Sequence, residues 1–131
     1  MLLAPILAFP AEAGRGGKVA RAQVRHLRRW LARDPVAALA DFHRRAELDP
    51  PMAAAPSSEE LARLAWGLEQ LELTPTLPTI PSRWHAWCGE SDALLDAARL
   101  TELITGLRCV PNANHHPQAL LRAAAHFLDE R

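Results

Sequence analysis

Hydrophobic residues follow two different spacings along this 131-residue chain. In residues 18–33 and 57–73 they recur every three or four positions, the period of an amphipathic helix. In residues 1–9, 83–88 and 107–110 they form short, nearly continuous runs, as in parallel strands with both faces covered. The pattern therefore predicts an α/β protein.

Two cap signals mark the helices of the first half. Asp34 and Pro35 predict an N-cap and the first position of a helix that runs to about residue 47, with Val36, Leu39 and Phe42 facing inward. Before residues 57–73, a serine followed three positions later by a glutamate, at positions 57 and 60, fits a capping box. Both signals predict well-defined helix starts.

The second half alternates between predicted strands and helices. Residues 74–82 contain three prolines and are predicted to be an extended connector. A strand, a helix closed by Gly106 as C-cap, a second strand and a last helix follow, which is typical of a parallel α/β arrangement. We therefore divide the chain into a first core strand with its loop, a helical cap of about three helices, and an α/β lobe, at residues 1–17, 18–73 and 74–131.

Composition is that of an ordinary globular domain, with 49% hydrophobic and 23% charged residues and no net charge. Residues 1–50 carry nine Lys/Arg against five Asp/Glu, and residues 51–131 carry six against ten. The overall balance argues against nucleic-acid binding, and no apolar run is long enough to span a membrane. The apolar N-terminus has no basic residue before it, which favours a strand over a signal peptide and predicts a cytoplasmic protein.

Metal and cofactor signatures are missing from the sequence. Cys88 and Cys109 have no metal-ligand spacing, and each falls in a predicted buried strand, where a free thiol behaves as a small hydrophobe. The glycines of residues 14–17 do not form a phosphate-binding pattern. We expect no metal, no cofactor and unreactive core thiols.

Candidate chemistry lies where the two predicted strands of the lobe end. Asp92 comes three residues after Gly89, and His115 and His116 lie in the loop after residues 107–110. Ligands and catalytic groups gather at the carboxyl ends of parallel strands. A carboxylate can hold an imidazole in the tautomer that a general base needs, with His115 preferred and His116 as the alternative. Asp92 would otherwise be a helix N-cap.

These features resemble the C-terminal half of the α/β-hydrolase superfamily. The resemblance rests on Gly-x-x-Asp at residues 89–92, the histidine loop at 111–117 and the helical segment before the acid-bearing strand. Within the superfamily the chain is most similar to the pimeloyl-ACP methyl ester esterases of biotin synthesis. The resemblance implies a partial α/β-hydrolase fold with a small parallel sheet of about three strands. It also implies Ser-His-Asp hydrolysis of carboxylic esters, with Asp92 as the acid and His115 as the base.

Two departures from the family pattern stand out. The family's usual glycine before the histidine loop is Asn112, and the nucleophile elbow Gly-x-Ser-x-Gly is absent from the chain. The family's elbow and first strands would all precede Met1. We therefore expect a truncated hydrolase whose nucleophile comes from a missing N-terminal half or from a partner, and whose isolated chain is inactive.

Binding residues are expected in the helical segment. The basic residues of 18–33 form either a solvated face or, as the resemblance implies, a docking surface for an acidic acyl-carrier protein that delivers the ester. On the third predicted helix Trp66 lines either an acyl pocket, with Leu64 and Leu68, or the core. The docking residues would be Arg21, Arg25, Arg28 and Arg29.

A different class of function is compatible with the same residues. Without a nucleophile, the chain would be a non-catalytic interaction protein, a hydrolase relic that binds acidic partners through its basic helix or associates with itself. A half-sheet would expose a strand edge and an apolar face at residues 1–9, which favours pairing.

Overall fold

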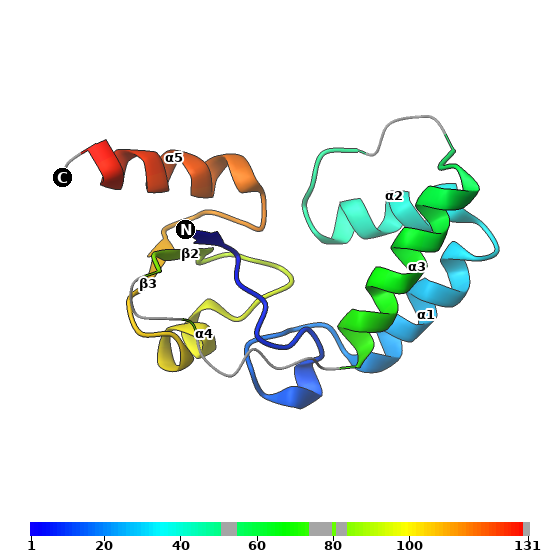
Figure 1. Ribbon diagram of the computed structural model, residues 1–131, viewed down its shortest axis with the longest axis horizontal. Coiled ribbons are helices and arrows are strands. Elements are labelled where there is room, and N and C mark those ends of the chain that lie inside the picture. Colours follow the sequence, from blue (N-terminus) through cyan, green and yellow to red (C-terminus); the bar gives the residue numbers. More distant parts are fainter. Residues whose placement is uncertain (51–54, 74–79, 81–83, 130–131) are drawn as a thin grey trace.

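The computed structural model describes residues 1–50, 55–73, 80 and 84–129 of the chain (Figure 1). A three-stranded parallel sheet and two helices form one part, called the sheet lobe here, and three further helices form a second part, called the helical layer. A mixed α/β fold is thereby confirmed. The elements are β1 (Leu2–Leu3), a short 3-10 helix η1 (Ala11–Ala13), α1 (Arg21–Leu31), α2 (Pro35–Arg45), α3 (Ser58–Glu72), β2 (Ala86–Gly89), α4 (Ala97–Leu103), β3 (Leu107–Val110) and α5 (Pro117–Asp129).

The central strand of the sheet is β2, which pairs in parallel with β1 on one side and β3 on the other. All four of its residues are buried, because α4 and α5 lie on opposite sides of the sheet (Figure 1). On the α5 side, the rings of Trp87 and Phe127 pack edge to face, and the guanidinium of Arg108 lies 3.8 Å from the Phe127 ring centre. Covering both faces explains why this strand is apolar throughout.

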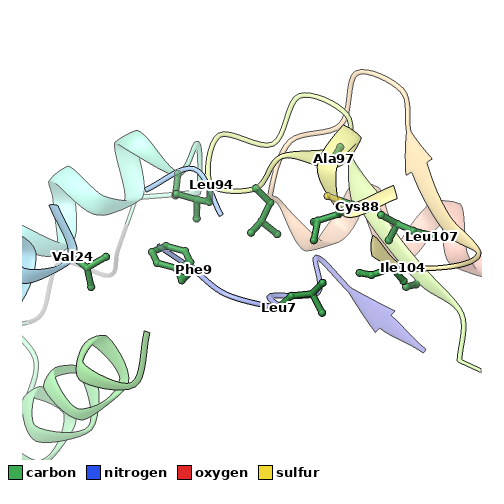
Figure 2. Close-up of a cluster of buried hydrophobic side chains, with 12 residues drawn as sticks. Leu7, Phe9, Val24, Cys88, Leu94, Ala97, Ile104 and Leu107 are labelled. Atoms are coloured by element: carbon green, nitrogen blue, oxygen red, sulfur yellow. The ribbon is translucent and has the colours of Figure 1, made fainter. Parts of the chain in front are cut away.

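The hydrophobic core continues from the sheet lobe into the helical layer. Leu7, Cys88 and Leu100 are buried in the lobe, and Figure 2 shows Phe9 between Val24 of α1 and the lobe residues. Ala46, at the end of α2, belongs to the same cluster. The two parts of the chain therefore share one core.

The predicted strand over residues 1–9 is wrong in extent, since only Leu2–Leu3 pair with the sheet. Ala4 has a φ of 46°, a left-handed conformation that turns the chain away from the extended direction. Pro5 then offers no N–H to a neighbouring strand. Leu7 and Phe9 are buried nonetheless, as core residues of an irregular segment.

Both cap signals are confirmed. The Asp34 side chain accepts a hydrogen bond of 3.1 Å from the Ala37 amide, and Pro35 occupies the first turn of α2. Ser57 and Glu60 form the reciprocal capping box, with the Ser57 amide donating to the glutamate at 2.7 Å. These bonds satisfy amides that have no partner inside the helix.

Several inward-facing and boundary predictions need correction. Val36 is 51% exposed, and the buried residue of α2 is Ala38, because α2 turns this face toward α1. The helix predicted over residues 94–105 is shorter, since α4 begins at Ala97 and ends at Leu103. Gly106 does adopt a left-handed φ of 79°, but it lies in the turn that leads into β3 rather than at the helix end.

The two cysteines differ, contrary to prediction. Cys88 is fully buried in the central strand, where desolvation, followed by the negative charge of Asp92, raises the pKa of its thiol to about 12. Cys109 is exposed on β3, although Leu107, two residues earlier on the same face of the strand, is buried. Its sulfur lies 3.3 Å from the Thr101 hydroxyl.

The described residues contain neither a helix that could cross a membrane nor a cluster of metal ligands. None of the helices within these residues has the length and apolar character needed to cross a membrane. No group of three or more His, Cys, Asp or Glu side chains in the same residues is placed to hold a metal ion. The predicted proline-rich connector lies outside the described residues, except for Ile80, which packs against the core.

Candidate functional site

The carboxyl ends of β2 and β3 lead into two loops that lie against each other. The first, residues 89–95, is called the acid turn, and the second, residues 111–117, the histidine loop. The Ser91 amide donates to the Ala113 carbonyl at 2.9 Å, and a Cβ atom on Gly89 would lie 2.4 Å from the carbonyl oxygens of Ala113 and Asn114. Glycine is therefore needed at position 89 because the other loop passes too close for any side chain.

Asp92 is 0% exposed and uses both of its carboxylate oxygens. Oδ1 accepts hydrogen bonds from the amides of Leu94 at 2.8 Å and Leu95 at 3.0 Å. Oδ2 lies 2.8 Å from Nδ1 of His115. The alternative prediction that Asp92 is a helix N-cap is wrong, because Asp92 caps the acid turn and the N-cap of α4 is Asp96.

His115 is oriented by this contact. A carboxylate only accepts hydrogen bonds, so the proton between the two groups belongs to Nδ1 of the imidazole. The second nitrogen, Nε2, has no hydrogen-bond partner among the residues that the structure describes, and the side chain is 21% exposed. In neutral His115 this leaves the Nε2 lone pair available to take a proton from a group that approaches from outside.

His116 has a different environment from its neighbour. Its Nε2 donates to the Asp49 carboxylate at 3.0 Å, and its Nδ1 accepts from the Gln118 amide at 3.3 Å. Both ring nitrogens are therefore occupied within the protein. Of the two candidate bases, only His115 contacts Asp92.

The histidine loop is also attached to the helical layer. The Asn114 side chain accepts from the His116 amide at 2.9 Å and donates to the Glu47 carboxylate at 3.3 Å. Asn112 has a φ of 56°, and asparagine adopts this left-handed conformation more readily than other residues with a side chain. Asn112 can therefore hold the left-handed turn at the start of the histidine loop without a glycine.

One contact of the site was not foreseen from the sequence. Lys18 was assigned to a helical basic face, yet it precedes α1, and its Nζ donates a 2.7 Å hydrogen bond to the backbone carbonyl of Asp92. The Lys18 amide also donates to the Leu94 carbonyl at 2.9 Å. No local sequence signal indicates this contact, since 74 positions separate the two residues.

The basic residues of α1 are largely engaged inside the helical layer. Arg25 pairs with Glu72 at 2.8 Å, and Arg28 lies 3.5 Å from Glu69. The hydrogen bond from Arg25 is the main cause that lowers the pKa of Glu72 below its usual value of 4.5. Arg29 is exposed, and the Arg21 amide, at the start of the helix, donates to Glu12 at 3.0 Å. The structure therefore joins α1 to α3 by charge.

Two apolar cavities lie beside the acid turn and inside the helical layer. The first, of about 460 Å³, extends from Ala93 and Leu94 to Phe9, Trp30 and other residues of α1, α2 and α3. The second, of about 290 Å³, lies among these three helices. Four residues line both cavities: Leu27, Phe42, Leu68 and Leu71.

The placement of Trp66 differs from both alternatives considered for it. Its side chain is 64% exposed and lines neither of these two cavities, so it is neither a wall of this space nor a core residue. Leu68 lines both cavities, and Leu64 lines the second. The apolar lining that was expected on α3 therefore exists, but it comes from its leucines.

A nucleophile for His115 is not found among the described residues. The Ser57 hydroxyl is used in the α3 capping box, and no hydrogen bond joins a serine hydroxyl to His115 in this part of the chain. Ser82 lies outside it. Comparisons with protein-family models, curated proteins and solved structures find no match to this chain.

Proposed function

We propose that Asp92 and His115 are the acid and base of a Ser-His-Asp hydrolase acting on carboxylic esters, with the nucleophile supplied from outside these 131 residues. One observation carries the proposal. The buried Asp92 carboxylate binds Nδ1 of His115, while Nε2 has no partner among the described residues. This is the arrangement in which a carboxylate fixes the tautomer of a general base.

The proposed reaction follows from that tautomer. Nε2 of His115 removes the proton of a serine hydroxyl as the serine oxygen attacks the ester carbonyl. Asp92 stabilises the imidazolium that forms, and the imidazolium then gives its Nε2 proton to the departing alcohol. Water repeats the sequence on the acyl-enzyme, which releases the carboxylic acid and restores the serine.

The substrate class comes from the resemblance to pimeloyl-ACP methyl ester esterases, which would make the ester part of an acyl chain carried by an acidic protein. In this proposal the four arginines of α1 attract the carrier, and Arg25 and Arg28 exchange their pairs with α3 for pairs with the partner. Binding of an acyl-carrier protein should then weaken with salt. Charge reversal at Arg29 should weaken it more than reversal at Arg44, an exposed arginine of α2.

The experiment that tests the hydrolase proposal starts from the protein produced in its own cells with a C-terminal tag. A fluorophosphonate probe should label a serine that co-purifies with the chain, and the preparation should hydrolyse p-nitrophenyl esters. His115→Ala should lower that hydrolysis by a factor on the order of 10⁴. His116→Ala is the matched control and should retain most of it. Equal activity in wild type and His115→Ala would contradict the proposal.

The competing proposal is a non-catalytic interaction protein. It is supported by the two amide hydrogen bonds that Asp92 accepts, which give this carboxylate a structural task without any reaction. It predicts that no probe-reactive serine accompanies the chain. It also predicts that Asp92 variants lose stability. Any loss of partner binding in these variants should then be proportional to the loss of folded protein.

A further inference from the structure

The first cavity has the size and the lining of a small-molecule site. Its volume of about 460 Å³ lies within the range of ligand pockets, which are mostly apolar with a few polar groups that fix orientation. Leu27, Trp30, Phe42 and Leu71 supply apolar walls. An aliphatic chain would bury its surface here at the expense of water that has few hydrogen-bonding partners.

Among the charged side chains that line the cavity, the positive charges outnumber the negative ones. Lys18, Asp41 and Arg45 line the cavity, and Arg45 is already paired with Asp41 at 2.7 Å. Lys18 has no carboxylate within ion-pair distance among the described residues, and one carbonyl takes one of its three ammonium protons. The lining therefore carries one uncompensated positive charge where the cavity reaches the acid turn.

We propose that this cavity binds an aliphatic carboxylate, with its chain between α1, α2 and α3 and its head group at the Lys18 ammonium. The carboxylate would accept hydrogen bonds from the ammonium protons that are not used by Asp92. Charge-assisted hydrogen bonds of this kind are about twice as strong as neutral ones. The site is separate from the Asp92–His115 pair, whose side chains do not line the cavity. The inference does not depend on the hydrolase proposal.

Trp30 provides a reporter inside the cavity. The chain has four tryptophans, of which Trp66 is largely exposed and Trp87 is buried beside α5, so Trp30→Phe identifies the signal that comes from the cavity. Octanoate should change the fluorescence of the wild-type protein saturably, and Trp30→Phe should remove that change. Octyltrimethylammonium, with the same chain length and the opposite charge, should bind at least about tenfold more weakly, as should neutral octanol, because neither can pair with Lys18.

Two variants with matched controls locate the ligand, with octanoate binding measured by titration calorimetry. Lys18→Met should weaken octanoate at least about tenfold and leave octanol unchanged, whereas Arg33→Met, at an exposed position after α1, should leave both unchanged. Ala22→Phe enlarges a residue that lines the cavity and should abolish octanoate binding, whereas Ala40→Phe, at a position that lines neither cavity, should not.

The inference is overturned if octanoate gives no saturable binding. It is also overturned if octyltrimethylammonium binds as well as octanoate, or if Lys18→Met and Ala22→Phe bind octanoate like the wild type. His115→Ala should bind octanoate normally. Loss of ester hydrolysis in that variant with normal octanoate binding would support both proposals, whereas octanoate binding without any serine-dependent hydrolysis would refute the hydrolase proposal alone.

Discussion

The sheet lobe and the helical layer differ in how completely their elements are buried. The central strand β2 is buried along its whole length, and its loop is held by the hydrogen bonds of Asp92. By contrast, α3 has no buried residue, and two apolar cavities lie beside it, although its end is tied to α1 by ion pairs. A dense lobe can fix the geometry of a pair such as Asp92 and His115, whereas loosely filled helices can accommodate a ligand.

Two glycine substitutions should show the largest difference in stability effect between the sheet lobe and the helical layer. Gly89→Ala places a Cβ atom against two backbone carbonyls, which cannot move without separating the loops, so we expect a loss of about 3 kcal/mol or more in the free energy of unfolding. Gly67→Ala meets no atom within 4 Å in α3 and should stabilise the protein by about 0.5 to 1 kcal/mol. Urea unfolding measures both. Equal effects would contradict the contrast between lobe and layer.

The Asp92 hydrogen bonds give the next largest effect. Asp92→Ala leaves the amides of Leu94 and Leu95 without their acceptor inside the lobe, which should cost about 2 to 4 kcal/mol in unfolding free energy. Asp92→Asn keeps one acceptor oxygen and should cost about 1 kcal/mol. Equal losses in the two variants would show that the amide bonds do not carry the stability of the acid turn.

Acid should weaken the link between α1 and α3 through Glu72. Its pKa in the folded protein is lowered below 4.5, mainly by the Arg25 hydrogen bond, so its contribution is complete above pH 4.5 and is lost as the pH falls through the folded-state pKa. Glu72→Gln should therefore lower the urea midpoint more at about pH 7 than at about pH 3. Glu102→Gln, in the sheet lobe, is the control for a surface ion pair. The same loss at both pH values would exclude the ion pair as the cause.

The smallest expected effect is on the reactivity of the two thiols, which reports local opening of the sheet lobe. The raised pKa of Cys88, about 12, and its full burial should keep it unreactive, whereas Cys109 is exposed. A disulfide reagent at neutral pH should modify Cys109 in the native protein and Cys88 only on unfolding. Cys109→Ser should remove the fast phase. Fast modification of that variant would show that the lobe opens more readily than its packing implies.

Local signals in the sequence predicted local structure well. The helix starts at Asp34 and Ser57 depend on side chains that bond to amides three residues away, and such bonds can be read from spacing. The strand over residues 107–110 is also confirmed, and its sequence signal is local as well: a short apolar run bounded by turn residues. The first strand was overestimated because the left-handed conformation of Ala4 has no signature in an apolar run.

The site was predictable only in part. The pairing of Asp92 with His115 follows from where the strands end, a general property of parallel sheets. The Lys18 contact with Asp92 and the Asp49 contact with His116 depend on how the helical layer packs onto the lobe. The pairing of Arg25 with Glu72 depends on how α1 packs against α3. Contacts between residues so far apart in sequence leave no periodic pattern, and each was missed.

The tautomer of His115 tests the central claim most directly. Long-range proton–nitrogen spectra of the protein labelled with nitrogen-15, with His115→Gln for assignment, distinguish a protonated Nδ1 from a protonated Nε2. When neutral His115 is observed, we predict that the proton is on Nδ1 and that Nε2 is bare, because Asp92 accepts at 2.8 Å. Asp92→Asn should shift the proton to Nε2 by offering an amide N–H to Nδ1. A wild-type His115 protonated on Nε2, or a tautomer unchanged in Asp92→Asn, would contradict the account.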